Sequence, residues 1–442
     1  MTDRDGAGAG RGSEQQPSRT RRDLPPRHDP RPYNPDGRPF FEGFDPESVP
    51  SPCFVVDTTA VEHNLRILRE TADRAGATIL LALKAFALPA VFGLVRRYLH
   101  GVCASGPYEA HLGQTEIGGQ VHTYGPAYSH ADLQTVLQVS DHLSFNSLAQ
   151  WARFRKDGLR AQGTRRNLKF GLRVNPEFSV GDTPLYDPCA PYSRLGTTAA
   201  QLHHDTVQYP QAWSGISGIH LHTLCENDSS ALEQTLVALE ERFGDVLRRP
   251  EISWLNLGGG HHITKPDYDR EHLVRLIHDV KERYHVEVIL EPGEAVAIHT
   301  GVLVASVLDL PVNGMNLAIL DTSATAHMPD TLEMPYRPEV WGSSPPGAAH
   351  HLYRLGGGTC LAGDVIGDYA FADSLSVGDR LVFDDMSHYT MVKTTTFNGI
   401  PLPAIATWNS HTRTGTVVRH GSYTDFRDRL GATPSSGDTY EF

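Results

Sequence analysis

Short runs of aliphatic and β-branched residues alternate with longer amphipathic segments from about residue 50 to residue 295. This alternation is typical of βα units built around a parallel sheet. Eight runs have the composition of buried strands: 78–86, 101–105, 121–124, 142–146, 168–174, 218–223, 253–257 and 287–290. Eight strands within about 215 residues, with helical segments between most of them, predict a (β/α)8 barrel rather than an open doubly wound sheet.

The segments between the runs carry the hydrophobic spacing of helices that cover a barrel. Before the seventh run, five large apolar residues follow at spacings of 4, 3, 4 and 4: Leu232, Leu236, Leu239, Phe243 and Leu247. This spacing places them on one face of a helix. The segment 273–284 repeats the pattern before the last run. Both segments are therefore expected to pack an apolar face against the barrel.

The two ends of the chain depart from this pattern. Residues 1–38 are rich in Gly, Pro, Arg and Asp and almost free of large aliphatic residues, which predicts a disordered tail. From residue 295 to 442 short alternating runs are separated by Gly and Pro, which predicts a β domain. The segment 39–60 contains a strand-like run that we expect to pair with this domain. The predicted fold class is thus α/β, with a barrel over 61–294 and a C-terminal β domain.

Composition narrows the classes of function. The chain has 442 residues, of which 39% are hydrophobic and 21% charged, and no apolar run approaches the roughly 20 residues of a membrane span. The net charge of -13 argues against non-specific binding to nucleic acid and is compatible with a small cationic ligand or a solvated acidic surface. The five cysteines form no CxxC pair, and the N-terminal segment contains no hydrophobic signal core, so a reducing cytoplasm is expected.

Three groups follow predicted strands at the barrel end where active sites lie. Lys84 ends an apolar run, where its amine is costly to bury unless it has a partner or is covalently bound. The glycine run 258–260 follows the seventh strand and lets backbone amides approach a phosphate. Glu291 follows the eighth strand, and a carboxylate facing a pyridine nitrogen keeps that ring protonated and able to accept electrons. Each group taken alone also has a purely structural interpretation. Lys84 could be a lysine at the barrel rim, the glycines could form a turn, and Glu294, three residues after Glu291, could cap a helix.

Two histidines offer a second kind of chemistry. His220 and His222 alternate on the sixth predicted strand, so both side chains are expected on one face. One of them could stack on a cofactor ring, and His222 lies nearer the mouth of the barrel. An HxH pair also binds zinc in many proteins, which makes a metal-dependent hydrolase the main rival interpretation.

Motifs farther along the chain make a family recognisable. They are Gly258-Gly259-Gly260-His261-His262-Ile263-Thr264, Glu291-Pro292-Gly293, Cys360-Leu361-Ala362-Gly363-Asp364-Val365 and the run from His388 to Gly399. With Lys84, they resemble the alanine-racemase-like barrel class of pyridoxal-phosphate decarboxylases, and within it the carboxynorspermidine/carboxyspermidine subgroup most closely. The resemblance runs from about residue 50 to residue 410, and its motifs are specific only when taken together.

The resemblance implies a role for each matching residue at the cofactor. Lys84 would hold pyridoxal 5'-phosphate covalently, Glu291 would bind the pyridine nitrogen and His222 would stack on the ring. The phosphate would lie on Gly259, Gly260 and Gly293, with the Tyr389 hydroxyl completing its cradle. Arg173 would support the face of the cofactor.

The resemblance also implies a homodimer with shared active sites. Cys360 and Asp364 would reach the site of the neighbouring subunit, where Cys360 protonates the product carbon and Asp364 holds the distal amine of a small cationic amino-acid substrate. Asp321 and Asp330 lie where relatives carry substrate-binding carboxylates. Val102 departs from the ornithine enzymes, which carry an aspartate there, so no salt bridge is expected at that position. The arginine of Tyr192-Ser193-Arg194 has no assigned partner.

The sequence therefore predicts a pyridoxal-phosphate decarboxylase of carboxynorspermidine or carboxyspermidine, without a metal. The alternatives are a decarboxylase of ornithine, lysine or diaminopimelate, a metal-dependent barrel hydrolase, a non-catalytic cofactor carrier and an amino-acid racemase. A racemase of this class is expected to carry a tyrosine at the position of Cys360.

Overall fold

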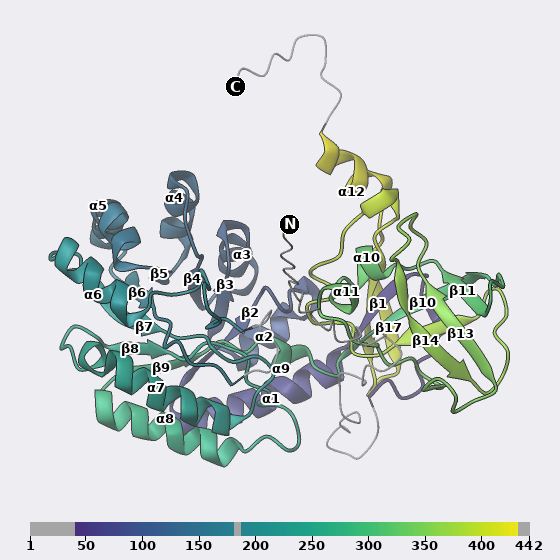
Figure 1. Cartoon of the computed structure of the whole chain (residues 1–442), viewed down its shortest axis with the longest axis horizontal. Coiled ribbons are helices and arrows are strands. Elements are labelled where there is room, and N and C mark those ends of the chain that lie inside the picture. Colours follow the sequence, from purple (N-terminus) through teal and green to yellow (C-terminus); the bar gives the residue numbers. More distant parts are fainter. Residues whose placement is uncertain (1–39, 181–186, 432–442) are drawn as a thin grey trace, which may run out of the picture.

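The computed structural model describes residues 40–180 and 187–431, so the tail predicted over 1–38 lies outside the described residues. Eight parallel strands close into a barrel, on the left of Figure 1. They are β2 (Thr78–Ala82), β3 (Gly101–Ala104), β4 (Gln120–Tyr124), β5 (His142–Phe145), β6 (Lys169–Arg173), β7 (Ile216–His220), β8 (Trp254–Asn256) and β9 (Glu287–Leu290). Pairing of Thr78 with Ile289 closes the ring. The predicted barrel is confirmed, because each hydrophobic run contributes one strand.

Two strands end three or more residues before their apolar runs do. Strand β2 stops at Ala82 rather than Phe86, because the N–H groups of Ala85 and Phe86 both donate to the Ala82 carbonyl and form a turn. Lys84 lies in this turn, outside the strand ladder. Strand β7 stops at His220, so the expectation that His220 and His222 share one strand is wrong: His222 lies in the following loop.

Helices surround the barrel and flank the sheet. They are α1 (Thr58–Ala75), α2 (Phe92–Tyr98), α3 (Pro107–Leu112), α4 (His130–Val139), α5 (Leu148–Thr164), α6 (Ala199–Gln208), α7 (Ser229–Leu247), α8 (Arg270–Tyr284), α9 (Glu294–Ala297), α10 (Ala324–His327), α11 (Asp330–Glu333) and α12 (Tyr423–Arg427). The predicted stripe of α7 packs inward, with Leu232, Leu239, Phe243 and Leu247 buried. Within residues 40–180 and 187–431, no helix has the length and apolar character needed to cross a bilayer.

A separate sheet of mixed direction forms the second unit, on the right of Figure 1. Its strands are β1 (Cys53–Asp57), β10 (Gly301–Asp309), β11 (Asn316–Leu320), β12 (Ser343–Ser344), β13 (His351–Gly356), β14 (Val365–Phe371), β15 (Arg380–Phe383), β16 (Ala404–Asn409) and β17 (Thr414–Arg419). Strand β1 pairs antiparallel with β10 and parallel with β16, which confirms that the N-terminal strand joins the C-terminal β domain. Phe41 and Phe44 pack their rings against Trp341, which anchors the start of the described chain to this sheet.

Candidate active site

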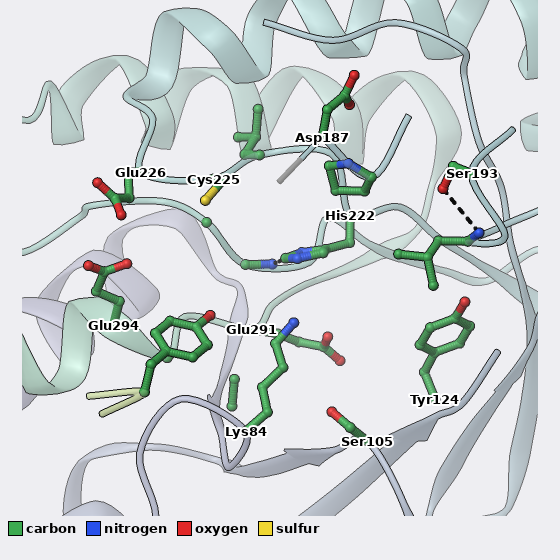
Figure 2. Close-up of a pocket in the computed structure, with 18 of the residues that line it drawn as sticks. Lys84, Ser105, Tyr124, Asp187, Ser193, His222, Cys225, Glu226, Glu291 and Glu294 are labelled. Carbon is green, nitrogen blue, oxygen red and sulfur yellow. Dashed lines mark hydrogen bonds between the residues drawn. The ribbon is translucent and has the colours of Figure 1, made fainter. Parts of the chain in front are cut away.

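A cavity of about 630 Å³ opens at the C-terminal ends of the barrel strands. Its walls come from the ends of β2 to β4 and β6 to β9 and the loops that follow them, and from α11 and the segment containing Tyr389 on the side of the sheet. Nine of the twelve predicted site residues line it: Lys84, Arg173, His222, Gly259, Gly260, Glu291, Gly293, Asp330 and Tyr389. Residues more than 300 positions apart in the sequence thus meet in one site (Figure 2).

The Glu291 carboxylate is held by the residues beneath the cavity. One oxygen accepts a hydrogen bond from Asn256 Nδ2 at 2.6 Å, and the other lies 3.5 Å from Nε2 of His220. Asn256 Oδ1 in turn accepts the Gly258 N–H at 2.8 Å, so one amide ties the carboxylate to the glycine run. Burial raises the pKa of Glu291, while the Asn256 amide and the Lys84 amine oppose this shift. Asn256 was not singled out from sequence, although it stands two residues before the glycines.

His222 presents its ring to the cavity with a defined tautomer. Its Nδ1 accepts the Gly259 N–H at 2.8 Å, which leaves any ring proton on Nε2. Burial, with Lys84 and Arg173 nearby, holds the pKa of His222 well below its ordinary value, so the ring is neutral near pH 7. Arg173 is buried rather than on the surface, donates to the His222 carbonyl at 3.1 Å and places its guanidinium 4.5 Å from the centre of the Tyr124 ring. A flat uncharged ring suits stacking on a cationic aromatic cofactor.

The predicted phosphate cradle has no room for side chains. A Cβ at Gly259 would lie 2.3 Å from the Glu291 carbonyl, and one at Gly293 would lie 2.5 Å from Ala85 Cβ. Gly260 has a φ of +82°, which L side chains rarely adopt. Backbone can therefore approach a ligand here as a phosphate requires. With an amine, a carboxylate and a neutral imidazole on the same cavity, this donor set fits pyridoxal phosphate.

Lys84 extends into the centre of the cavity, beside Glu291 and below His222 (Figure 2). Two groups near it were not singled out from sequence. The Cys103 thiol donates to Glu291, and burial raises the pKa of this thiol well above its ordinary value. Glu109 accepts the Ser105 N–H at 2.6 Å and interacts electrostatically with the Lys84 amine, so a carboxylate accompanies the lysine even though Val102 supplies none.

One wall of the cavity is acidic. In Figure 2, Glu226 and Glu294 face one another on the side of Lys84 away from Tyr124. Single ligand atoms of Glu226, Glu294 and His262 lie within 4.8 Å of one another. The cap interpretation of Glu294 is wrong, because Gly293 is the N-cap of α9 and Glu294 is the first residue of the helix, with its side chain on the cavity. Glu294 stands three residues after Glu291, and this closeness in sequence was the feature that could have indicated its place on the cavity.

Asp330, also on the cavity, is paired with a lysine of this chain. Its carboxylate contacts Lys393 Nζ at 2.5 Å, and Glu333 contacts the same amine at 3.1 Å. A substrate cation that binds Asp330 must therefore share it with Lys393 or displace that lysine.

The remaining predicted residues do not line this cavity. Asp321 accepts the Ser306 N–H at 2.8 Å within the sheet. Asp364 accepts hydrogen bonds from Ser323, Thr325 and Thr359 at 2.6–3.2 Å and so organises its own loop. Cys360 is exposed on the surface.

The zinc interpretation of the HxH pair gains no support from this geometry. Among residues 40–180 and 187–431, the cluster of three metal-type side chains is Glu226, His262 and Glu294, which includes neither His220 nor His222. His220 instead faces Glu291 and packs edge-on against Tyr124, with ring centres 5.3 Å apart.

Comparison with known proteins assigns the chain to a family. The family described as pyridoxal-dependent decarboxylase, C-terminal sheet domain, matches residues 53–387. A carboxyaminopropylagmatine decarboxylase of Synechocystis sp. is 47% identical over 388 residues, covering 87% of this chain and 96% of that protein. A carboxynorspermidine/carboxyspermidine decarboxylase of Campylobacter jejuni is 40% identical over 391 residues, covering 86% and 98%.

Similarity in three dimensions agrees with this match. The crystal structure of carboxynorspermidine decarboxylase complexed with norspermidine from Campylobacter jejuni aligns with a TM-score of 0.77 at 39% identity, covering 86% of this chain and 100% of that one. The cavity described above also carries the lysine, carboxylate and glycine cradle that such a cofactor needs. This chain therefore belongs to the pyridoxal-dependent decarboxylases and is a carboxy-lyase that uses pyridoxal 5'-phosphate.

Proposed function

We propose that the enzyme removes the α-carboxylate from a carboxylated polyamine, carboxynorspermidine or carboxyspermidine, and releases norspermidine or spermidine. The carrying observation is the acidic wall beside Lys84, where Glu226 and Glu294 approach one another. An ammonium nitrogen lies about 2.8 Å from a carboxylate oxygen that accepts from it, so one nitrogen fits between two oxygens 4.8 Å or less apart. Two relatives at 40% and 36% identity bear the name of this activity.

The residues of the cavity divide the work of the reaction. Bound pyridoxal phosphate supplies a ring that accepts the electron pair left by the departing carboxylate. Lys84 holds the cofactor, Glu291 holds the proton on the ring nitrogen, and His222 packs on the ring face. Gly259 and Gly293, with Gly260 and the Tyr389 hydroxyl, hold the phosphate.

Carboxyaminopropylagmatine is a second candidate substrate. The relative with 47% identity is named for this compound, which ends in a guanidinium rather than an amine. A planar guanidinium can donate to two carboxylates at once, so the pair of Glu226 and Glu294 also suits it.

The test is carbon dioxide release by the purified, cofactor-loaded enzyme from a panel of substrates. The panel contains carboxynorspermidine, carboxyspermidine, carboxyaminopropylagmatine, ornithine, lysine and diaminopimelate. We expect kcat/KM to be highest for one of the first two. A preference for carboxyaminopropylagmatine would replace the leading substrate with the second candidate, and a preference for a short amino acid would refute both.

We further propose that the enzyme is a homodimer whose subunits share active sites. Cys360 is exposed together with the apolar side chains of Leu361 and Phe397, which suits a contact surface. The Cys360 thiol would protonate the product carbon in the partner's cavity.

Subunit mixing tests this sharing. Dimers of Lys84→Ala and dimers of Cys360→Ala are each expected to have little activity, because every site lacks one group. Mixed dimers contain one site with both groups, so combining the two proteins under conditions of subunit exchange should restore a fraction of wild-type carbon dioxide release. Exchange without recovery would place Cys360 outside the active site.

A cytoplasmic location is proposed as well. It is supported by five cysteines that are all free thiols, as a reducing compartment requires.

A further inference from the structure

The segment that follows β15 is fixed against the floor of the active site. Asp385 and Tyr389 both have positive φ, at 55° and 48°, which non-glycine residues adopt only when their surroundings hold them there. The Tyr389 N–H donates to the Ala85 carbonyl at 2.7 Å, directly beside Lys84. The Met386 N–H donates to the Gly301 carbonyl at 2.9 Å. The side chains of this segment therefore have set positions behind the cavity wall.

His388 lies within this segment, between the buried carboxylates of Glu294 and Asp385. Its side chain is 1% exposed. Its Nδ1 is 3.7 Å from one oxygen of Glu294, and its Nε2 is 3.3 Å from Oδ1 of Asp385. The other Glu294 oxygen lies 3.4 Å from Nε2 of His262, so each oxygen of Glu294 faces a different imidazole.

Asp385 is itself anchored from a third element. Its Oδ1 accepts the His299 N–H at 2.7 Å, and its Oδ2 lies 3.8 Å from Nδ1 of the same residue. A series of contacts thus runs from the backbone after α9, through Asp385 and His388, to the carboxylate of Glu294. No residue of the cofactor-binding set belongs to this series.

These contacts behind Glu294 oppose the electrostatic repulsion between the two carboxylates of the acidic wall. Two carboxylates as close as Glu226 and Glu294 repel one another, and the Glu294 side chain is only 10% exposed. Without polar groups behind it, Glu294 would turn away from Glu226, because rotation would relieve the repulsion. The imidazoles of His262 and His388 occupy that space and keep the carboxylate directed at the cavity.

We propose that His388 and Asp385 are positioning residues for substrate recognition, holding Glu294 in the orientation that receives the distal cation of the substrate. This role rests on the proposed function. His388 belongs to the motif that ends at Gly399. Its proposed role differs from that of its neighbour Tyr389, which would bind the phosphate.

The test compares KM with kcat in cofactor-loaded variants, using the best substrate of the panel. His388→Leu and Asp385→Asn are expected to raise KM about tenfold, with kcat and the visible absorbance of the bound cofactor nearly unchanged. His388→Asn, which returns an amide near the position of Nδ1, should recover part of the loss. The matched control is His272→Leu, since His272 also lies 3.5 Å from a glutamate, Glu233, but does not line the cavity.

A double-mutant cycle separates positioning from a general structural effect. If His388 acts through Glu294, then adding His388→Leu to Glu294→Gln should raise KM no further. Additive effects, a fall in kcat at unchanged KM, or loss of cofactor absorbance in both His388→Leu and Asp385→Asn would overturn the positioning role. A wild-type enzyme that decarboxylates no carboxylated polyamine would instead refute the proposed function, and the positioning role with it.

Discussion

Replacing Lys84 with alanine is expected to lower kcat on the order of 10³-fold or more and to abolish the visible absorbance of the bound cofactor. The side chain reaches the centre of the cavity from the turn after β2, and the variant would leave the cofactor without a covalent link. The fall in kcat would have two causes. The cofactor loses its covalent attachment, and the site loses an amine that could transfer protons at the reacting carbon. Carbon dioxide release and absorbance spectra of the purified variant provide the measurement.

Lys169→Ala is the matched control for this substitution. Lys169 begins β6 at the opposite end of the barrel and pairs there with Glu287 on the surface. Its removal should leave both readouts close to wild type, because exposed ion pairs contribute little to stability. A Lys84→Ala enzyme that retained both absorbance and activity would end the assignment of the cofactor site.

The position of Lys84 shows where sequence reasoning succeeds and where it stops. The apolar run 78–86 correctly predicts a buried barrel strand, because strands covered on both faces read as continuous hydrophobic runs. Composition does not reveal that the N–H of Ala85 turns back to Ala82. The predicted strand is therefore four residues too long, although it places the lysine at the correct end of the barrel.

The substrate side of the cavity was harder to predict than the cofactor side. Lys84, Glu291 and the glycines follow strand ends, whose positions periodicity indicates. Glu226 lies in a loop after His222, and its approach to Glu294 depends on how that loop folds against the start of α9.

Hydrogen bonds within loops were equally hard to predict from the sequence. The role predicted for Asp364 ignored the bonds that it accepts from Ser323 and Thr359 in its own subunit. Such contacts form between segments far apart in the sequence, so local sequence patterns do not predict them.

Glu291→Gln is expected to lower kcat about 10²–10³-fold while KM changes little. In the proposed site the carboxylate would hold the proton on the ring nitrogen, and an amide of the same shape cannot balance that charge. Asn256 would still donate to the side-chain oxygen, so the fold should be unaffected. Glu287→Gln, an exposed exchange at the start of β9, the strand that Glu291 follows, is the control and should retain wild-type kcat.

The pH dependence of cofactor binding gives an independent measurement of the same carboxylate. Burial raises the pKa of Glu291 above its ordinary value of 4.5, so the carboxylate is protonated as the pH falls through that raised value. An uncharged carboxyl cannot stabilise a protonated ring nitrogen, so the affinity of the wild-type enzyme for pyridoxal phosphate should fall on acidification. The Glu291→Gln enzyme has no carboxylate to protonate at this position. Its affinity for pyridoxal phosphate at neutral pH should therefore be lower than that of the wild type, and should fall less on acidification. Parallel pH curves for the two proteins would show that the ring nitrogen takes its charge balance from another group.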